Sequence, residues 1–572
     1  MPGSLPTNDA IAGQLELLAD LSEILGEDGF RIRAYRTAAA RIRESGTSVA
    51  QLAQRGEATG LQGIGRTIEA KIVEAIEDGE VQALTKRRAE VPGEVAAFLR
   101  LPGVGPRTAA RIWRELGVTT LADLREAAES GRLRALQGLG ATSEQKILRA
   151  LEAGGAEDVP RRGLLGVGLP VVREVVAALR AHPAAVRVSE AGSARRRRET
   201  FRDLDVIATA TDPEALIAFY IALPGVLEVV AHGDTKATVV TQQGLRLDLR
   251  VVPPECYGDL LQHFTGSKEH NIALREEAVR RGLSISEYGV TIVETGEVRA
   301  FATEEELYAF LGYQYVPPEL RENAGELEAA RCGELPALVE QGDLRGDMHC
   351  HSTWSSDARS TIEEMALASR ARGYRFLVVT DHSHYLREGR LHAQWEEIAE
   401  LDARLRPFRV LRGIEANIRS DGTVDVPDDE LAQLDWVVAS LHTSFDRSPT
   451  ERVLAAIDNP HVDCIGHLTG RRLSRAQRRH GAPIDVERIV ARAAETGTAL
   501  GINSQPDRLD LRDVHARLAG EAGVLVPVNT DAHSVQALDY AELGVAQARR
   551  AWLTKEQVLN TRTWARIDKM RR

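Results

Sequence analysis

A chain of 572 residues, 43% of them hydrophobic, is long enough for about four domains with cores of their own. Its 84 acidic and 72 basic residues give a net charge of −12, which does not by itself indicate nucleic-acid binding. We find neither the roughly 20 apolar residues of a membrane span nor a signal peptide in the start MPGSLPTNDA. Four scattered cysteines without CxxC spacing favour a reducing cytoplasm.

Residues 10–150 show the apolar spacing of helices, as in ELLADLSEIL and IEAKIVEAIED. Three short turns there, LQGIG, LPGVG and LQGLG, each place two glycines just before a helix; the glycines are Gly63, Gly65, Gly103, Gly105, Gly138 and Gly140. Glycine permits a tight turn, and the free amides of a helix start favour phosphate. One such turn is often a mere connection. Three resemble helix-hairpin-helix modules, which contact the DNA backbone without sequence preference.

Lys71 has two readings. It lies beside the apolar stripe of Ile68, Ile72 and Ile76, along which its stem could pack. It is also one of only seven lysines, and its amine could form a Schiff base with an abasic-site aldehyde. Residue chemistry alone favours packing.

From residue 160 the pattern becomes α+β. A helix-like VVREVVAALRAH leads into the strand-like runs AVRVSEAG, DLDVIATA, KATVVTQ and LRLDLRVV. Asp203 and Asp205 alternate on one strand and so share a face, and Asp248 lies on the polar face of another. Three such aspartates could hold two Mg²⁺ ions about 4 Å apart.

A candidate phosphate site lies upstream of these aspartates. Gly192 and Ser193 end a strand, where an amide and a hydroxyl could hold a triphosphate, and Arg196 could add charge-assisted contacts. Arginines are frequent throughout residues 161–202. They form either a solvated face or a phosphate-binding surface.

This pattern (Gly192-Ser193, Arg196, Glu199, Asp203 and Asp205) resembles the palm of the family X DNA polymerases, as does the segment HFTGS at 263–267. The resemblance covers residues 1–317. It implies roles for four further residues: Phe264 and Gly266 beside the sugar of the incoming nucleotide, Asn271 at the base edge and Arg275 at the template. It also makes the lyase reading of Lys71 as strong as the packing reading. Arg197 and Arg202 stand where the family often has glycine, and Arg202 could either grip or crowd a triphosphate.

The C-terminal third contains the segment GDMHCHSTWSSD, in which His349 and His351 lie two apart. Side chains at i and i+2 of a strand point to one side. More candidate ligands follow other apolar runs: His382, Glu415, His442, His467, Asp531 and His533. A lone histidine is more often a buried, hydrogen-bonded one. Six histidines and their carboxylates at strand ends instead predict a metal site.

Residues 344–572 resemble the polymerase and histidinol phosphatase (PHP) family of metal-dependent phosphoesterases. The resemblance implies a distorted α/β barrel of the β7α7 type with a trinuclear cluster held by His349, His351, Asp357, His382, Glu415, His442, His467, Asp531 and His533. The family usually has Ser-Asp-Gly where this chain has Ser355-Ser356-Asp357. Asp357 is therefore displaced by one residue.

Together the two resemblances fit the bacterial family X DNA polymerase with a C-terminal PHP domain. The expected order is a helical lyase-like domain at 1–88, a helix-hairpin-helix domain at 89–155, a nucleotidyltransferase palm at 156–252, a nucleotide- and template-binding fingers/thumb subdomain at 253–318, a polar linker at 319–343 and the PHP domain at 344–572.

The implied function is gap-filling DNA repair synthesis, coupled to a 3′–5′ exonuclease and an abasic-site lyase or endonuclease. Mg²⁺ or Mn²⁺ would occupy the palm, and two to three Mn²⁺, Zn²⁺ or Fe²⁺ ions the PHP site. The expected partners are gapped or primed double-stranded DNA and deoxynucleoside triphosphates, with no membrane. We expect a monomer in the bacterial cytoplasm, associated with the nucleoid.

Two alternatives remain at this point. One is a metallophosphatase of small phosphate esters that carries DNA-tethering modules. The other is a non-catalytic DNA-binding scaffold. The triad Asp203, Asp205 and Asp248 argues against the first, and the nearly complete ligand set argues against the second.

Overall fold

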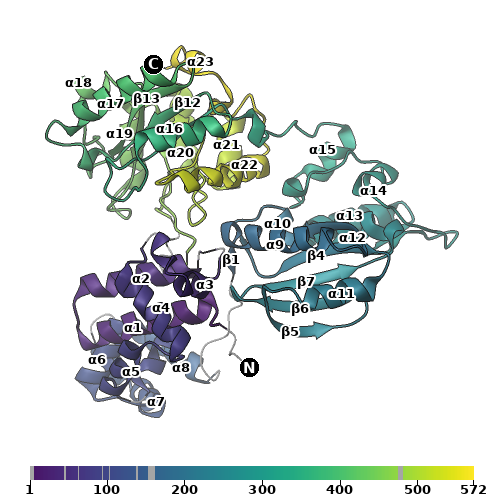
Figure 1. Ribbon diagram of the computed structural model, residues 1–572, viewed down its shortest axis with the longest axis horizontal. Coiled ribbons are helices and arrows are strands. Elements are labelled where there is room, and N and C mark those ends of the chain that lie inside the picture. Colours follow the sequence, from purple (N-terminus) through teal and green to yellow (C-terminus); the bar gives the residue numbers. More distant parts are fainter. Residues whose placement is uncertain are drawn as a thin grey trace.

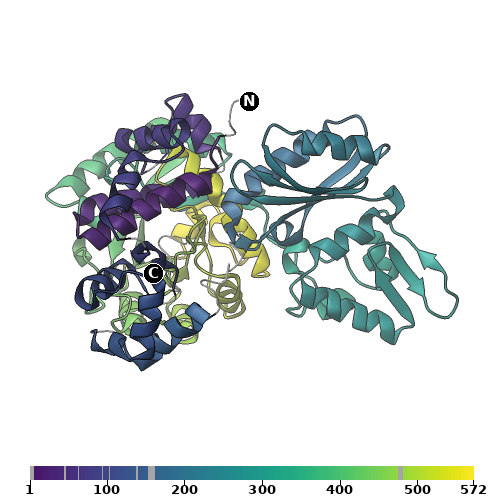
Figure 2. The same cartoon turned by 90° about the horizontal axis from the view of Figure 1, so that it is seen from below.

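The computed structural model describes residues 5–571 apart from positions 44, 46, 62, 93, 102–103, 137–138, 153–161, 475–478 and 480. It shows a helical N-terminal body, a mixed body built on a twisted sheet, and a C-terminal α/β body. The mixed body lies to one side of the other two in both views (Figures 1 and 2). Among the described helices, none has the length and apolarity that a membrane crossing needs.

Helices with glycine-containing turns form the N-terminal body. They are α1 (Asn8–Leu25), α2 (Gly29–Arg43), α3 (Val49–Gln54), α4 (Arg66–Glu77), α5 (Gln82–Glu90), α6 (Pro106–Leu116), α7 (Leu121–Glu129) and α8 (Ala141–Glu152). Thr7 and Thr120 cap α1 and α7 by accepting backbone N–H bonds. One apolar cluster runs from Ile11 to Leu151, so both parts of the helical region share a core.

A five-stranded sheet of order β2-β4-β7-β6-β5 lies in the region predicted as the palm. Its strands are β2 (Ala185–Ala191), β4 (Leu204–Ala210), β5 (Val226–His232), β6 (Lys236–Thr241) and β7 (Arg246–Val251), and β1 (Gly163–Leu164) pairs separately with β3 (Thr200–Phe201). The helices α9 (Leu165–Arg180) and α11 (Pro213–Ile221) pack on the sheet core, and the short α10 (Gly192–Arg195) follows β2. Alternation in LRLDLRVV is confirmed, because the leucines of β7 are buried.

Beyond the sheet, residues 257–333 form a smaller subdomain. Its elements are α12 (Tyr257–Thr265), α13 (Lys268–Arg280), β8 (Leu283–Ser286), β9 (Gly289–Ile292), β10 (Val298–Arg299), α14 (Glu304–Phe310) and α15 (Glu326–Cys332). The segment 319–343, predicted as a linker, contributes Leu320 and Ala330 to this core. Its buried Arg321 pairs with Glu304, and Glu326 pairs with His270 at 2.6 Å.

The C-terminal body is a distorted barrel of parallel strands. The strands are β11 (Gly346–Cys350), β12 (Phe376–Val379), β13 (Arg409–Asn417), β14 (Trp436–Ser440), β15 (Cys464–Gly466), β16 (Ala499–Leu500), β17 (Ile502–Asn503) and β18 (Val528–Asn529). β11 to β16 form one sheet in sequential order, and β17 pairs with β18. Residues after β18 return to β11, where the backbone N–H of Asp531 donates to His349 O at 2.9 Å. The helices are α16 (Ile362–Ala371), α17 (Arg390–Leu405), α18 (Asp428–Leu431), α19 (Pro449–Asp458), α20 (Val486–Thr496), α21 (Asp513–Glu521), α22 (Ala541–Arg550) and α23 (Trp564–Asp568).

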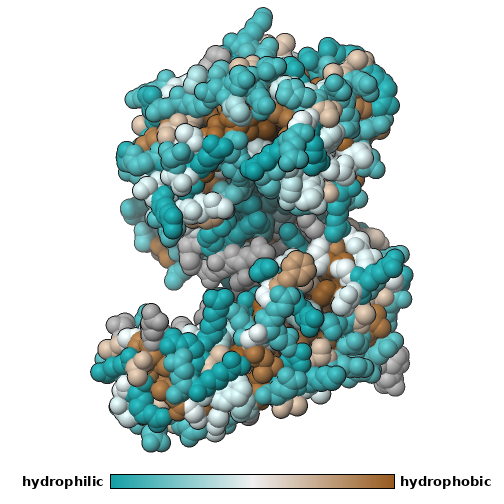
Figure 3. Space-filling model, turned by 90° about the vertical axis from the view of Figure 1, so that its left-hand side faces the viewer, coloured by the Kyte–Doolittle hydropathy of each residue, from teal (hydrophilic) through white to brown (hydrophobic). Residues whose placement is uncertain are grey.

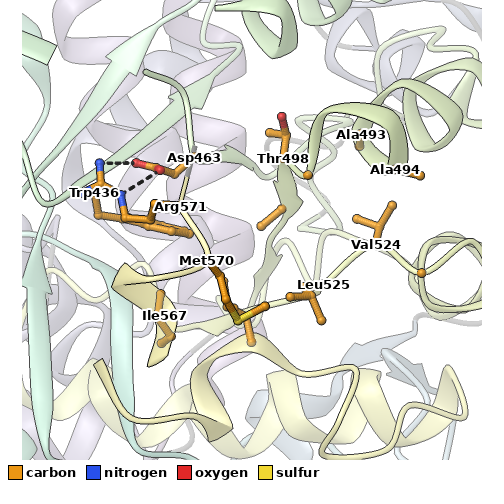
Figure 4. Close-up of a pocket in the computed structure, with 14 residues that line it drawn as sticks. Trp436, Asp463, Ala493, Ala494, Thr498, Val524, Leu525, Ile567, Met570 and Arg571 are labelled. Atoms are coloured by element: carbon orange, nitrogen blue, oxygen red, sulfur yellow. Dashed lines mark hydrogen bonds and ion pairs between the residues drawn. The ribbon is translucent and has the colours of Figure 1, made fainter. Parts of the chain in front are cut away.

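A cavity of about 160 Å³ lies at the amino-terminal ends of the barrel strands (Figure 4). Its lining includes Trp436 at the start of β14, Leu525 and Met570, and Arg571 bonds Asp463 beside it at 2.9 Å. The predicted metal ligands follow the opposite, carboxyl ends of the strands. The cavity is therefore separate from the candidate site.

Candidate active sites

The palm aspartates lie together because β4 and β7 run parallel in a register that pairs Asp205 with Asp248. Asp203 directly precedes β4, and Nε of Arg246 lies 3.8 Å from its carboxylate and 3.7 Å from that of Asp248. Burial, followed by the charges of Asp248 and Asp203, raises the pKa of Asp205 to about 7. Three crowded carboxylates that repel one another form a donor set that suits Mg²⁺ or Mn²⁺.

The turn at Gly192 packs directly against this triad. Gly192 has a φ of 64°, and a Cβ built on it would lie 2.1 Å from Oδ2 of Asp205. Both the positive φ and the close approach require glycine. Ser193 follows in α10, so the turn presents its backbone beside the carboxylates.

Arg196, the predicted triphosphate ligand, already has protein partners. Its Nε donates to Glu322 at 3.0 Å and its Nη1 to the carbonyl of Thr265 at 2.8 Å. The two arginines that stand where the family often has glycine differ in their surroundings. Arg197 pairs with Glu190 at 2.7 Å, whereas Arg202 is exposed.

One residue of the segment HFTGS contacts the five-stranded sheet. The ring of Phe264 lies against Arg250 of β7, whose guanidinium carbon is 4.6 Å from the ring centroid. Asn271 instead donates to the carbonyls of His263 and Gly266 at 2.8 and 3.3 Å. Arg275 bonds the ring of His263 at 2.8 Å. Asn271 and Arg275, both on α13, thus contact the end of α12 and the turn that follows it.

In the C-terminal body, the predicted ligands converge on Glu415 near the end of β13. Its carboxylate oxygens lie 2.9 Å from Nε2 of His467, 3.3 Å from Nε2 of His442 and 2.7 Å from Nδ1 of His382. Glu415 is fully buried. A buried carboxylate amid so many imidazoles is typical of a metal centre.

The HxH pair faces both Glu415 and Asp531. Nε2 of His349 lies 3.5 Å from Glu415 and 3.7 Å from Asp531, and Nε2 of His351 lies 3.7 and 3.0 Å from the same carboxylates. Burial, with the charges of His533 and His382, lowers the pKa of His351 to about 3. Its ring is therefore neutral, the form in which imidazole binds metals.

Asp357 reaches the site despite its shifted position. Its Oδ2 lies 3.4 Å from Nε2 of His382 and 3.6 Å from Nε2 of His533. The Asp357 side chain is 41% exposed, whereas most of the other candidate ligands are buried. It therefore marks the open side of the cluster.

Several ligand atoms of this cluster are buried and, although some lie close to a carboxylate, make no hydrogen bond of suitable geometry among the described residues. They are Nε2 of His349, both ring nitrogens of His351, Nδ1 of His382, Nδ1 of His467 and Oε2 of Glu415. Unpaired buried polar atoms are costly. Bound cations would remove that cost, and three sets of residues have ligand atoms within 4.8 Å of one another: His351, His382 and His533; His349, His351 and Glu415; and His382, Glu415 and His442. The residues present thus fit a cluster of metal ions.

The helical hairpins share one backbone pattern. In each, the residue before the second glycine donates its N–H to the leucine that opens the turn: Ile64 to Leu61, Val104 to Leu101 and Leu139 to Leu136, at 3.0–3.2 Å. Gly65 and Gly105 are the N-caps of α4 and α6, and Gly140 directly precedes α8. Gly63 has a φ of 84° and lies against Thr37. Gly103 and Gly138 lie outside the described residues.

Comparison with known proteins connects these sites. Family models match a helix-hairpin-helix domain at residues 6–81, a SAM-like helix-hairpin-helix tandem at 95–153, a DNA polymerase beta thumb at 260–322 and a PHP domain at 347–503. The protein of Bacillus subtilis (strain 168) named DNA polymerase/3′-5′ exonuclease PolX is 40% identical over 565 residues, which are 97% of either chain. The chain belongs to the PolX family.

Two proteins named probable phosphatases match a smaller part of the chain. Those of Thermoanaerobacter sp. (strain X514) and Vibrio parahaemolyticus serotype O3:K6 are 31% and 28% identical over 229 and 234 residues. These are 38% and 39% of this chain, but 89% and 91% of the phosphatases. The similarity to these phosphatases thus covers about one domain of this chain, whereas the similarity to the PolX protein covers 97% of it.

Two arginines near these candidate sites were not predicted from the sequence. Arg250 lies on the same face of β7 as Asp248, and the alternation in LRLDLRVV could have indicated it. Arg508 follows β17, its Nε lies 3.9 Å from Asp531, and its side chain is 11% exposed. Nothing local marks Arg508, because β17 spans two residues and the loop after it has no periodicity.

Proposed function

We propose that this PolX-family protein is a DNA-directed DNA polymerase for gap-filling repair, with a metal-dependent 3′–5′ exonuclease in its PHP domain. The observation that carries the proposal is that one chain holds two separate centres. One is the carboxylate triad with Gly192 packed on it. The other is the histidine cluster around Glu415. The 40% identity to a PolX protein over 97% of the chain supports assigning both activities to one protein.

For synthesis, Asp203, Asp205 and Asp248 would hold Mg²⁺ or Mn²⁺, which supplies charge stabilisation to phosphoryl transfer. The triad would orient the 3′-hydroxyl of the primer and accept its proton. The Gly192 turn would hold the triphosphate by its backbone. Phe264 and Gly266 would lie beside the sugar, with Asn271 and Arg275 toward the base and template.

For degradation, the nine PHP residues would hold two to three Mn²⁺, Zn²⁺ or Fe²⁺ ions, which supply an activated water for phosphodiester hydrolysis. His351 and His467 would bind as neutral rings, since their pKa values are lowered to about 3. Arg508 would hold the scissile phosphate, since its guanidinium adjoins the ligand Asp531.

DNA would approach the nuclease through the hollow between the C-terminal and N-terminal bodies. The coloured surface of the C-terminal body that borders it is largely hydrophilic (Figure 3). Arg359 bridges the two bodies here. Its Nη1 donates to the carbonyl of Gly60, just before the first hairpin, at 2.8 Å, and its backbone N–H donates to His533 O. A hairpin that binds backbone phosphates would thus lie beside the metal cluster. We further propose that the protein acts as a monomer in the bacterial cytoplasm, at the nucleoid.

Extension and degradation of a labelled primer on gapped DNA, with Mg²⁺ and Mn²⁺ separately, tests both activities. We expect gap filling with nucleotides and shortening from the 3′ end without them. Degradation without extension would favour a PHP nuclease that carries DNA-binding modules. Hydrolysis of small phosphate esters alone would favour the metallophosphatase.

We expect Lys71 to form a covalent adduct with abasic DNA. It lies on α4 directly after the first hairpin, with its Nζ 5.9 Å from the ring centroid of Tyr35. Borohydride should trap the complex, and Lys71→Ala should lose it. Lys86→Ala, an exposed lysine on α5, is the matched control. Equal trapping in Lys71→Ala would leave Lys71 as a packing residue.

Arg508→Ala is expected to weaken DNA binding at the nuclease. A charge-assisted hydrogen bond contributes about 1.5–3 kcal/mol, so the exonuclease KM should rise roughly ten- to a hundred-fold. Primer extension should stay unchanged. The exposed Arg512→Ala serves as control. An unchanged exonuclease KM would show that Arg508 does not contact the substrate.

A further inference from the structure

The PHP domain contacts the polymerase palm at residues 196–199, which connect the Gly192 turn to Asp203. Nη1 of Arg550, at the end of α22, donates to the carbonyl of Arg196 at 2.9 Å. Arg471 donates to both carboxylate oxygens of Glu199, at 3.2 and 2.6 Å. Nε2 of Gln547 donates to the same carboxylate at 2.9 Å. Three side chains of one domain thus hold Arg196 and Glu199, the two ends of a four-residue segment of another.

The side chains that make these contacts are buried, which restricts their movement. The side chains of Arg550 and Arg471 are 3% and 6% exposed, and Gln547 is buried. Arg550 is anchored on its own domain by Asp513, which accepts from its Nη2 at 2.6 Å. A buried, bidentate arginine pair is geometrically specific, and removal of one partner leaves an uncompensated charge. The loop is therefore held in one position.

Glu322 lies between Arg550 and Arg196 and interacts electrostatically with both. Its Oε1 lies 3.0 Å from Nε of Arg196 and 3.0 Å from Nη1 of Arg550, and 3.7 Å from Nη1 of Arg198. Arg550 thus provides Glu322 with a second cation. Without it, the carboxylate would neutralise Arg196 more fully, and less positive charge would face a triphosphate.

We propose that the PHP domain positions the triphosphate-binding turn of the polymerase through Arg550 and Arg471, independently of its own metal centre. Both are positioning residues, because they act through Arg196 and Glu199 and need not touch the nucleotide. This inference rests on the proposed polymerase function. It gives the PHP domain a second role, in which its surface residues maintain the conformation of the nucleotide-binding site.

Steady-state gap filling with one nucleotide tests this role in the full-length chain. Arg550→Ala should raise the nucleotide KM about ten-fold, with kcat within about two-fold and exonuclease activity unchanged. Arg550→Lys should be intermediate, since one ammonium cannot bond Arg196, Glu322 and Asp513 as a guanidinium does. Arg549→Ala is the matched control, because its side chain bonds Glu319 and the carbonyl of Val339 but not the 196–199 loop.

A second substitution separates positioning from a general loss of structure. Adding Glu322→Gln to Arg550→Ala should bring the nucleotide KM back toward the wild-type value, because no carboxylate at position 322 then compensates the positive charge of Arg196. A merely destabilised interface would not be rescued in this way. If Arg550→Ala does not fold, which loss of exonuclease activity would reveal, Glu199→Gln replaces it and should raise KM several-fold.

The outcomes distinguish this inference from the function on which it rests. A wild-type protein that does not extend primers would overturn the polymerase assignment. A wild-type protein that extends them, with the KM unchanged in folded Arg550→Ala or in Glu199→Gln, would overturn the positioning role alone. A KM that rises equally in Arg549→Ala would also overturn it, since any loosening of the domain junction would then suffice.

Discussion

Asp205→Ala is expected to abolish primer extension and to leave the exonuclease intact. Asp205 pairs with Asp248 across β4 and β7, Gly192 packs on its carboxylate, and burial together with the two neighbouring charges raises its pKa. Loss of a metal-bound carboxylate should remove about 4 kcal/mol or more of transition-state stabilisation, or roughly a thousand-fold in rate. Single-turnover extension of a primer across a one-nucleotide gap measures this effect.

The control is Asp234→Ala, an exposed aspartate in the turn between β5 and β6 of the same sheet. It should extend primers at the wild-type rate. The exonuclease, measured on the same preparations without nucleotides, should be equal in all three proteins because its residues lie in another domain. Extension by Asp205→Ala at the wild-type rate would remove the triad from the mechanism.

In both centres, the residues that lie on strands or directly after them could be singled out from the sequence. Asp205 and Asp248 stand out because the strand period of two places polar residues opposite buried leucines. Glu415, His442 and His467 stand out because polar side chains directly follow buried runs in parallel strands. Such local patterns need no knowledge of distant contacts. They indicated strands with candidate ligands at their ends, whereas the barrel and the nine-residue ligand set were implied by the resemblance to the PHP family.

The contacts between domains were not predictable in this way. Arg550 and Arg196 are 354 residues apart, and in the sequence each is one of many arginines on a helix or loop. The predicted linker misleads similarly, because the charges of Arg321 and Glu326 suggest solvent although both are buried in ion pairs. Only the tertiary fold shows which charges are buried. Arg508 belongs to the same class.

His349→Ala is expected to remove exonuclease activity and to lower the metal content of the chain. The side chain is buried, its Nε2 lies 3.5 Å from Glu415 and 3.7 Å from Asp531, and that atom has no hydrogen-bond partner among the described residues. Without it, the ligand set His349, His351 and Glu415 is incomplete. We expect a loss of roughly a thousand-fold in degradation rate, with primer extension retained.

Metal analysis is best done in the Asp205→Ala background, so that ions in the palm contribute less to the total. After loading with Mn²⁺ or Zn²⁺, that protein should retain more than one ion per chain through gel filtration, and the added His349→Ala should lose at least one. His392→Ala, an exposed histidine on α17, controls for surface binding by imidazole. Chelation should abolish degradation in the parent, and Mn²⁺ should restore it there but not in His349→Ala. Equal metal content and equal degradation with and without His349 would contradict a metal-dependent nuclease at this end of the barrel, because Nε2 of His349 faces both carboxylates of the cluster.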